Sequence, residues 1–198
     1  MENIQFPLNF SFKIFTPSND FSVIDAGGHE IAYTRQKIFK IKESVQIFRN
    51  ASRNELLYTV KADRIIDFNA SYTVRDAADN VLGSIKRSGM KSLWKTSYTV
   101  HDAAGRQLYS LQEKNPWIAV LDGLLSEVPL VGTLSGYLFN PSYSITDGSG
   151  GEVFTLKKEP SFFERKFSLH KNGGASSAED ILVLNAAMML MLLERGDG

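Results

Sequence analysis

One short pattern recurs along most of the chain. Four segments read aromatic, hydroxyl, β-branched, any residue and Asp, with Gly or Asp three positions further on: 21–28, 72–79, 98–105 and 143–150. Weaker copies begin at Val45 and Phe167. The starts recur about every 25 residues, apart from one longer gap between the fourth and fifth copies. This period predicts one supersecondary unit repeated six times.

Each unit has the properties of a β-hairpin. Tyr72 and Val74 alternate with hydroxyl side chains, as in a strand with one buried face. The Asp can close an Asx-turn, and the Gly can adopt a positive φ. Second strands follow at 81–85, 107–111 and 152–156, and a leading strand alternates from Leu8 onwards. Five hairpins, this leading strand and a closing strand in the sixth unit predict twelve strands.

The sixth unit is followed by a helix. Ser176 and Glu179 form a capping-box pattern, and Gly196 provides a stop signal. Between them, residues 181–193 are apolar on every side except at Asn185, so the helix must be buried all round. This run is too short to span a bilayer, which takes about 20 residues.

A closed barrel of twelve strands is too wide for its own side chains to fill, and an apolar helix is a suitable plug. The sequence therefore predicts one domain, 1–198, that is a mainly β, 12-stranded antiparallel barrel closed around a buried C-terminal hydrophobic helix. We expect the barrel over 6–171, with an apolar insertion at 116–141, and the central helix over 177–195.

Composition excludes several classes of protein. The 198 residues are 43% hydrophobic, which excludes a disordered chain. The absence of cysteine excludes disulfides and thiol catalysis. Lys and Arg number 22 and so do Asp and Glu, which argues against a nucleic-acid-binding protein. The first residues lack the features of a signal peptide, so we expect a cytoplasmic protein.

The repeated hairpins followed by an apolar C-terminal helix resemble the Tubby C-terminal-like superfamily, which includes Tubby proteins, LURP-one-related proteins and phospholipid scramblases. The resemblance runs from Leu8 to Leu193, and the stand-alone LURP-one-related domains are closest in layout. It implies a 12-stranded barrel around a central helix. Tubby domains bind phosphoinositide headgroups through basic surface residues. The scramblase features, an acidic calcium loop, a cysteine cluster and a proline-rich tail, are absent from this sequence.

The link between the third and fourth hairpins is the main candidate binding segment. It carries Lys86, Arg87, Lys91 and Lys95, with Trp94 beside them. Basic side chains around a glycine can hold a phosphate, and Trp can lie at a lipid interface. These four residues are the predicted headgroup site. The alternative is a solvated hairpin end whose charges prevent aggregation.

The insertion 116–141 is unusually apolar for a loop. One face at helical spacing is formed by Trp117, Val120, Leu121, Leu124 and Leu125. Either the insertion is a lid that contacts a partner or a membrane, or it is a cap over one end of the barrel.

No catalytic, metal or cofactor site is predicted. Asp25, Asp76, Asp102 and Asp147 share one place in the hairpin turns, which explains them as structural residues. The three histidines lack metal-binding spacing, and no nucleophile elbow or phosphate-binding glycine loop is present.

We therefore expect a non-enzymatic binding or scaffold domain whose partner is an anionic phospholipid or a protein. It would be a monomer without a transmembrane span, cytoplasmic or peripheral at a membrane. The alternative is a scramblase-like, lipid-handling protein whose helix moves into a membrane. The two differ in whether residues 181–193 are enclosed and Asn185 has a hydrogen-bond partner inside.

Overall fold

The computed structural model describes residues 4–12, 19–36, 44–66, 69–88, 97–114, 142–160 and 165–196. It contains twelve strands and one helix, α3 (Ser177–Gly196). The strands are β1 (Leu8–Phe12), β2 (Asn19–Ile24), β3 (Glu30–Gln36), β4 (Ser44–Phe48), β5 (Leu56–Ile66), β6 (Asn69–Asp76), β7 (Val81–Ser88), β8 (Ser97–Asp102), β9 (Gln107–Glu113), β10 (Ser142–Thr146), β11 (Glu152–Glu159) and β12 (Arg165–Lys171).

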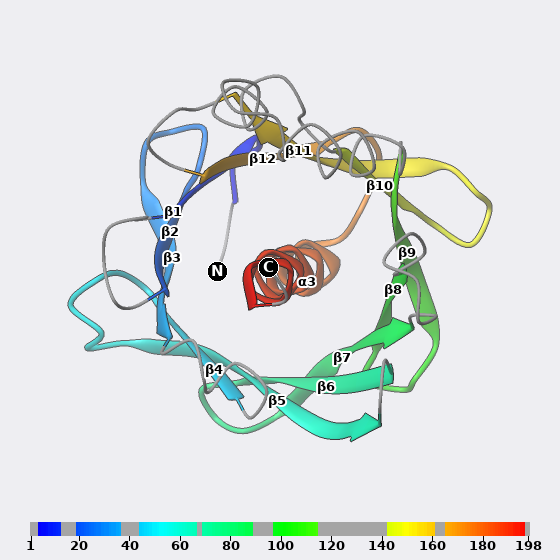
Figure 1. The fold of residues 1–198 in the computed structure, drawn as a ribbon, viewed down its shortest axis with the longest axis horizontal. Helices are drawn as coiled ribbons and strands as arrows, with labels where there is room; N and C mark the ends of the chain where they lie inside the picture. The colour runs from blue at the N-terminus through cyan, green and yellow to red at the C-terminus, as the bar shows by residue number, and fades with distance from the viewer. Residues whose placement is uncertain are drawn as a thin grey trace, which may run out of the picture.

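The strands form one closed antiparallel barrel in which each strand pairs with its neighbours along the chain. The barrel closes where β1 pairs with β12, from Leu8 opposite Leu169 to Phe12 opposite Arg165. α3 runs through the middle of the ring of strands (Figure 1). The predicted fold, a 12-stranded barrel around a C-terminal helix, is confirmed.

The repeated motif forms the hairpin turns as predicted. In the hairpin between β6 and β7, the Asp76 N–H donates to the Asn80 carbonyl at 3.0 Å, and Asp79 has a φ of 67°. The hairpin between β8 and β9 repeats this geometry with Asp102 and with Gly105 at a φ of 82°. The register shifts by one residue just before each of these turns, so the bulge belongs to the repeat.

The core lies between the barrel wall and α3. Aromatic and β-branched side chains from alternate strand positions point inward, as the period of two requires. Residues 182–193 of α3 are buried without interruption. The wall supplies the rings, and the helix supplies aliphatic side chains and three methionines.

Asn185 is the polar residue within this buried stretch of α3, and it is fully buried. Its amide nitrogen donates to the Ile181 carbonyl of the same helix at 2.8 Å. Its Oδ1 has no hydrogen-bond partner within the described part of the chain. The enclosure expected of a binding domain is therefore present, and Asn185 has its hydrogen-bond partner inside, the Ile181 carbonyl of its own helix.

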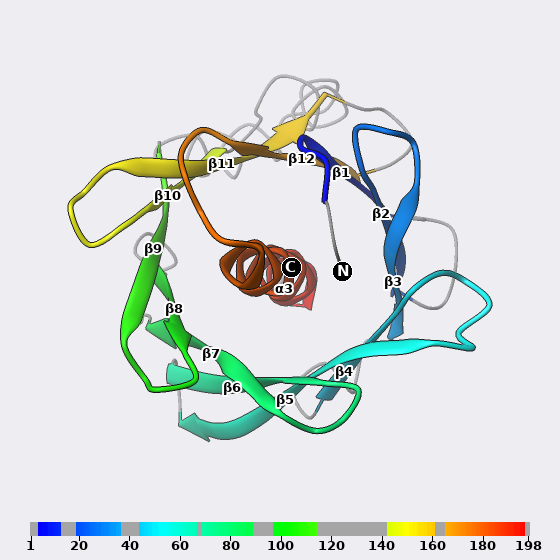
Figure 2. The same ribbon diagram turned by 180° about the vertical axis from the view of Figure 1, so that it is seen from behind.

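The two ends of the barrel differ. At one end, here called the turn end, lie the five hairpin turns and the start of α3 (Figure 2). At the other, here called the far end, the chain leaves each odd-numbered strand from β1 to β11 and returns in the next strand. α3 runs from the turn end toward the far end, because it follows β12.

The start of α3 is fixed to the turn end by polar contacts. Ser176 and Glu179 form the predicted capping box: the Ser176 N–H donates to Glu179 Oε2 at 2.7 Å, and the Glu179 N–H donates to Ser176 Oγ at 3.3 Å. Lys171 Nζ lies 2.8 Å from Asp180 Oδ1 and donates to the Ala175 carbonyl.

None of the described helical residues forms a helix long and apolar enough to cross a membrane.

Candidate functional site

Lys86 and Arg87 lie side by side on β7, but they face opposite sides of the barrel wall. Lys86 is exposed on the outer face, opposite Ser71 of β6 and Thr99 of β8. Arg87 lies opposite Tyr98, whose ring is buried in the core. Of the four predicted headgroup residues, the outer face of β7 therefore presents Lys86, while Lys91 and Lys95 lie outside the described residues.

Hydroxyl side chains surround Lys86 on the outer face of β6, β7 and β8. They belong to Ser71, Thr73, Ser84 and Thr99. Such side chains can both donate and accept hydrogen bonds, and a phosphate or a sugar-like headgroup offers both kinds of partner. This wall therefore has the chemistry to bind a polar anion through Lys86.

Lys61 is a second cation on the same wall, which the sequence analysis did not single out. It lies on β5 opposite Thr73, two strands from Lys86. With strands about 4.8 Å apart and about 3.3 Å per residue, both side chains can reach one small anion between them. Neither lysine makes an ion pair with any residue in the described ranges.

One carboxylate opposes these cations. Asp63 Oδ2 accepts a hydrogen bond of 2.6 Å from Thr73 Oγ1 and a longer one of 3.5 Å from Ser71 Oγ. Its negative charge makes this part of the wall less favourable for an anion. Its carboxylate also occupies two of the hydroxyl groups as hydrogen-bond donors. The site is therefore a hydroxyl-lined surface with two lysines and one aspartate.

The repeated aspartates are structural. Asp147 Oδ1 accepts hydrogen bonds from the N–H groups of Ser149 and Gly151, and Asp76 Oδ1 does the same for Ala78 and Asn80. The pKa of both carboxyl groups is lowered, first by the side-chain hydrogen bonds from Asn80 to Asp76 and from Ser149 to Asp147, and then by these backbone hydrogen bonds. The pKa of Asp102 is likewise lowered, first by the N–H of Arg106. The turns therefore explain these carboxylates without catalysis.

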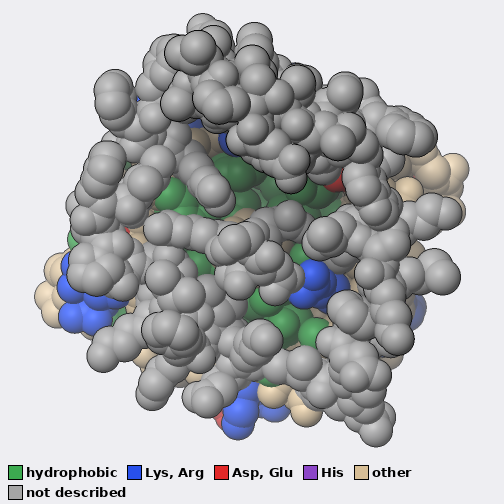
Figure 3. Space-filling view, in the orientation of Figure 1, with side chains coloured by type: hydrophobic (Ala, Val, Ile, Leu, Met, Phe, Trp, Pro, Cys, Tyr) green, Lys and Arg blue, Asp and Glu red, His purple; other side chains and the backbone are tan. Residues whose placement is uncertain are grey.

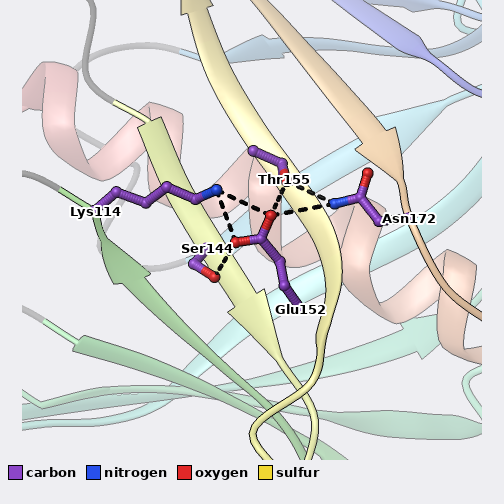
Figure 4. Close-up of polar contacts among 5 residues, drawn as sticks. All are labelled: Lys114, Ser144, Glu152, Thr155 and Asn172. Carbon is purple, nitrogen blue, oxygen red and sulfur yellow. Dashed lines mark hydrogen bonds and ion pairs between the residues drawn. The ribbon is translucent and has the colours of Figure 1, made fainter.

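A separate polar cluster on the wall joins β10 and β11 to the residues that directly follow β9 and β12 (Figure 4). Its centre is Glu152, at the start of β11. Lys114 Nζ lies 2.7 Å from Glu152 Oε2, and Ser144 Oγ donates to the same oxygen at 2.5 Å. Thr155 and Asn172 donate to Oε1 at 2.6 and 3.3 Å. Sequence reasoning missed this cluster because its members are brought together only by strand pairing.

The contacts of Glu152 lower its pKa to about 2, with the Lys114 hydrogen bond as the largest cause and the Ser144 hydroxyl next. The carboxylate is therefore ionised at neutral pH and is fully supplied with donors. It lacks the raised pKa that a general acid at neutral pH needs. The cluster is a clamp that holds β9, β10 and β11 together with the segment after β12.

Ser168, His170 and Glu159 also lie together, but not as a hydrolase triad. The Ser168 hydroxyl donates to Glu159 Oε1, and His170 Nε2 lies 3.0 Å from Ser168 Oγ. In a triad the histidine accepts the serine proton, and the carboxylate binds the other ring nitrogen. Here the carboxylate binds the serine hydroxyl directly, and Ser168 is only 4% exposed. This arrangement does not prepare a nucleophile.

No group of His, Cys, Asp and Glu with the geometry of a metal site occurs among the residues described.

Comparison with known protein families gives a match over part of the chain. The model of the family described as LURP-one-related matches residues 30–121, which run from β3 past the end of β9. No curated protein matches the chain, and no solved structure matches it. The matched hairpins carry Lys61 and Lys86, and the barrel and helix are those that the sequence resemblance implies. Residues 30–121 therefore carry a match to the LURP-one-related family, which belongs to the Tubby C-terminal-like superfamily.

Proposed function

We propose that this protein is a non-enzymatic binding domain that engages anionic phospholipid headgroups at a membrane surface. The observation that carries the proposal is the setting of Lys86. Its side chain is exposed, makes no ion pair with the described residues and lies between the hydroxyls of Ser71 and Thr99. Lysine ammonium groups bind phosphate as point charges, and neighbouring hydroxyls complete the hydrogen bonding.

The sequence of the β7–β8 link supports the same proposal. Lys91, Trp94 and Lys95 follow Lys86 within the segment that joins β7 to β8 at the far end. Basic residues near an anionic membrane each contribute about 1 kcal/mol to binding, and Trp favours the interface. A peripheral protein at the cytoplasmic face, where anionic lipids are concentrated, fits this set.

The binding role is favoured over the alternative, a scramblase-like protein that moves lipids. In that alternative α3 would enter a bilayer, yet residues 182–193 are enclosed by the barrel wall. A non-enzymatic role is supported by the polar clusters, whose carboxylates are paired with donors rather than left available for proton transfer.

Co-sedimentation with vesicles tests the proposal. Wild-type protein is expected to sediment with phosphatidylcholine vesicles that contain phosphatidylserine or a phosphoinositide, and not with phosphatidylcholine alone. The triple variant Lys86→Gln, Lys91→Gln, Lys95→Gln should lose most of this binding. The matched variant Lys86→Arg, Lys91→Arg, Lys95→Arg keeps the charges and should retain it.

Thermal unfolding of each variant shows whether it is folded. Equal binding by a folded Gln variant and the wild type would rule out the proposed site. If the wild type bound no anionic vesicle, the proposed function would be ruled out.

A further inference from the structure

The charges of this neutral chain are divided between the two ends of the barrel. We counted charges in the three residues of each strand nearest the far end. Eight are basic: Arg35, Arg64, Lys86, Arg87, Lys157, Lys158, Arg165 and Lys166. Three are acidic: Asp20, Glu113 and Glu159. Figure 3 views the molecule from this end, and Lys and Arg side chains show at separate points between the grey atoms.

The segments that connect strands at the far end do not cancel this excess. By sequence they add basic residues at 13, 37, 40, 42, 91, 95 and 114, and acidic residues at 43, 67, 122, 127 and 164. Their net contribution is two positive charges (7 − 5), against five from the strands (8 − 3). The basic excess of the far end therefore comes mainly from the strands themselves.

The turn end has the opposite sign. In its five turns, carboxylates outnumber arginines: Asp25, Glu55, Asp76, Asp79, Asp102 and Asp147 stand against Arg49, Arg53 and Arg106. Glu179 and Asp180 at the start of α3 add two more carboxylates beside Lys171. The lowered pKa values of Asp76, Asp102 and Asp147 keep these turns ionised well below neutral pH.

The two ends act separately on a partner. A strand of eight residues, such as β7, is about 26 Å long. The screening length at physiological ionic strength is about 8 Å. An anionic surface in contact with one end is therefore screened from the charges of the other, and the zero net charge of the whole chain does not describe the field at either end.

The positions of the strands that carry these basic residues indicate which side of the barrel would face an anionic surface. These strands are β3, β5 and β7 on one side of the ring and β11 and β12 on the other (Figure 1). No single side wall presents all of them. The far end is the side of the molecule toward which all of these strand ends point.

We infer that the barrel docks on an anionic bilayer end-on, with the far end toward the lipid and the acidic turn end toward the solvent. The inference rests on the proposed function and adds its orientation. The ion pair of Arg35 with Asp20 neutralises one basic residue of the rim. Lys86 and Lys157 are exposed and make no ion pair with the described residues. They are therefore the strongest contributors on the two sides.

Single-cysteine labelling tests the orientation, because the chain has no cysteine of its own. An environment-sensitive fluorophore is attached at Ser11→Cys or Ser88→Cys, which lie near the far end on opposite sides of the ring, or at Ala77→Cys or Ala104→Cys in the turns. The vesicles contain phosphatidylcholine, phosphatidylserine and a nitroxide-labelled lipid as quencher. Both far-end labels should be quenched and both turn labels should not.

Each other result has a distinct meaning. Quenching of the turn labels, or of one far-end label alone, would overturn end-on docking while vesicle binding itself stood. Bound protein with no label quenched would also overturn it. If the unlabelled protein did not bind these vesicles, both the proposed function and the orientation that rests on it would be ruled out.

Charge variants give an independent measure. Lys86→Gln with Lys157→Gln should weaken binding to phosphatidylserine vesicles about 25-fold, since each basic residue near the surface is worth about a factor of five. The control is Arg53→Asn with Arg106→Gln, which removes the same charge from the turn end and should leave binding within about twofold. Equal losses in the two double variants would contradict the inference.

Discussion

A β-carbon placed on Gly83 would lie 2.9 Å from Cδ2 of Leu182. Gly83 is on β7 and Leu182 is in the second turn of α3, so the helix lies against the wall here with no space for a β-carbon between them. The same β-carbon would also collide with the backbone carbonyl oxygen of His101 on β8. The equivalent positions in the next two hairpins are Tyr109 and Phe154, each opposite the same kind of aliphatic residue. Because Gly83 has no side chain where the next two hairpins have an aromatic ring, α3 can lie directly against β7 and β8.

Gly83→Ala should lower the free energy of unfolding by about 1–3 kcal/mol, because the added methyl overpacks a rigid contact. Chemical denaturation with a linear extrapolation measures this change. Gly174→Ala is the matched control, since a β-carbon there meets nothing within 4 Å. It should change stability by less than about 0.5 kcal/mol. A stable Gly83→Ala variant would show that α3 can move away from the wall.

Charges placed inside the barrel should prevent folding. Leu184→Asp or Leu190→Asp puts a carboxylate at a fully enclosed position of α3, where no water can solvate it. The milder Leu184→Ala should cost about 2–5 kcal/mol and remain folded. Circular dichroism and thermal unfolding distinguish the two.

The control for a buried charge is Ala178→Asp, which adds the same group at an exposed position in the first turn of α3. A negative charge is favourable there, so this variant should fold with unchanged or slightly higher stability. Cooperative unfolding of Leu184→Asp like that of the wild type would contradict central burial.

The Glu152 clamp should make stability depend on pH. The pKa of Glu152 is about 2 in the folded protein, below the value of about 4.3 in an unfolded chain. Its contribution is therefore complete above pH 5 or so and is lost as the pH falls toward 2. Partial exposure screens the interaction, so Glu152→Gln should cost about 1–2 kcal/mol at neutral pH. Denaturation at several pH values should show the two proteins converging in acid.

Lys114→Gln tests whether the lysine or the neighbouring hydroxyl groups cause the low pKa of Glu152. Because Lys114 has the largest effect on Glu152, its removal should move the pKa of Glu152 upward toward 4.5. Titration of the side-chain carboxyl carbon by NMR measures this directly. An unchanged pKa would mean that the hydroxyls of Ser144 and Thr155 are sufficient.

Asp63→Asn should strengthen binding to anionic vesicles. Among the described residues, the change removes the carboxylate that lies on the same wall as Lys61 and Lys86, while keeping an acceptor for Thr73. An increase of about fivefold is expected for one charge near the surface. Asp79→Asn, which makes the same change at the turn end, should have no effect, and Asn tolerates the positive φ found there. Equal gains from both variants would point to net charge rather than to this wall.

The repeat made much of the fold predictable. Local signals, such as the Asp turns and the capping box of Ser176 and Glu179, gave the hairpins and the start of the helix. Counting hairpins gave the number of strands, and the all-round apolar helix indicated what fills the lumen. The position of Gly83 was visible in the sequence, but its contact with Leu182 depends on where the helix lies across the barrel.

The candidate site was less predictable. The basic link was treated as one patch, although adjacent residues of a strand point to opposite faces, which separates Arg87 from Lys86. Lys61 joins Lys86 only through the pairing of β5, β6 and β7. The division of charge between the ends depends on the direction of every strand at once, so no local pattern indicates it.

Closure of the ring has a consequence for synthesis. β1 obtains its second neighbour only when β12 is available, about 150 residues later in the chain, and α3 follows β12. A nascent chain on the ribosome therefore holds an open sheet whose aromatic face is uncovered until the final segment emerges. Truncation within α3 would leave that face without its plug, and chaperones that bind exposed apolar surface would retain such a chain.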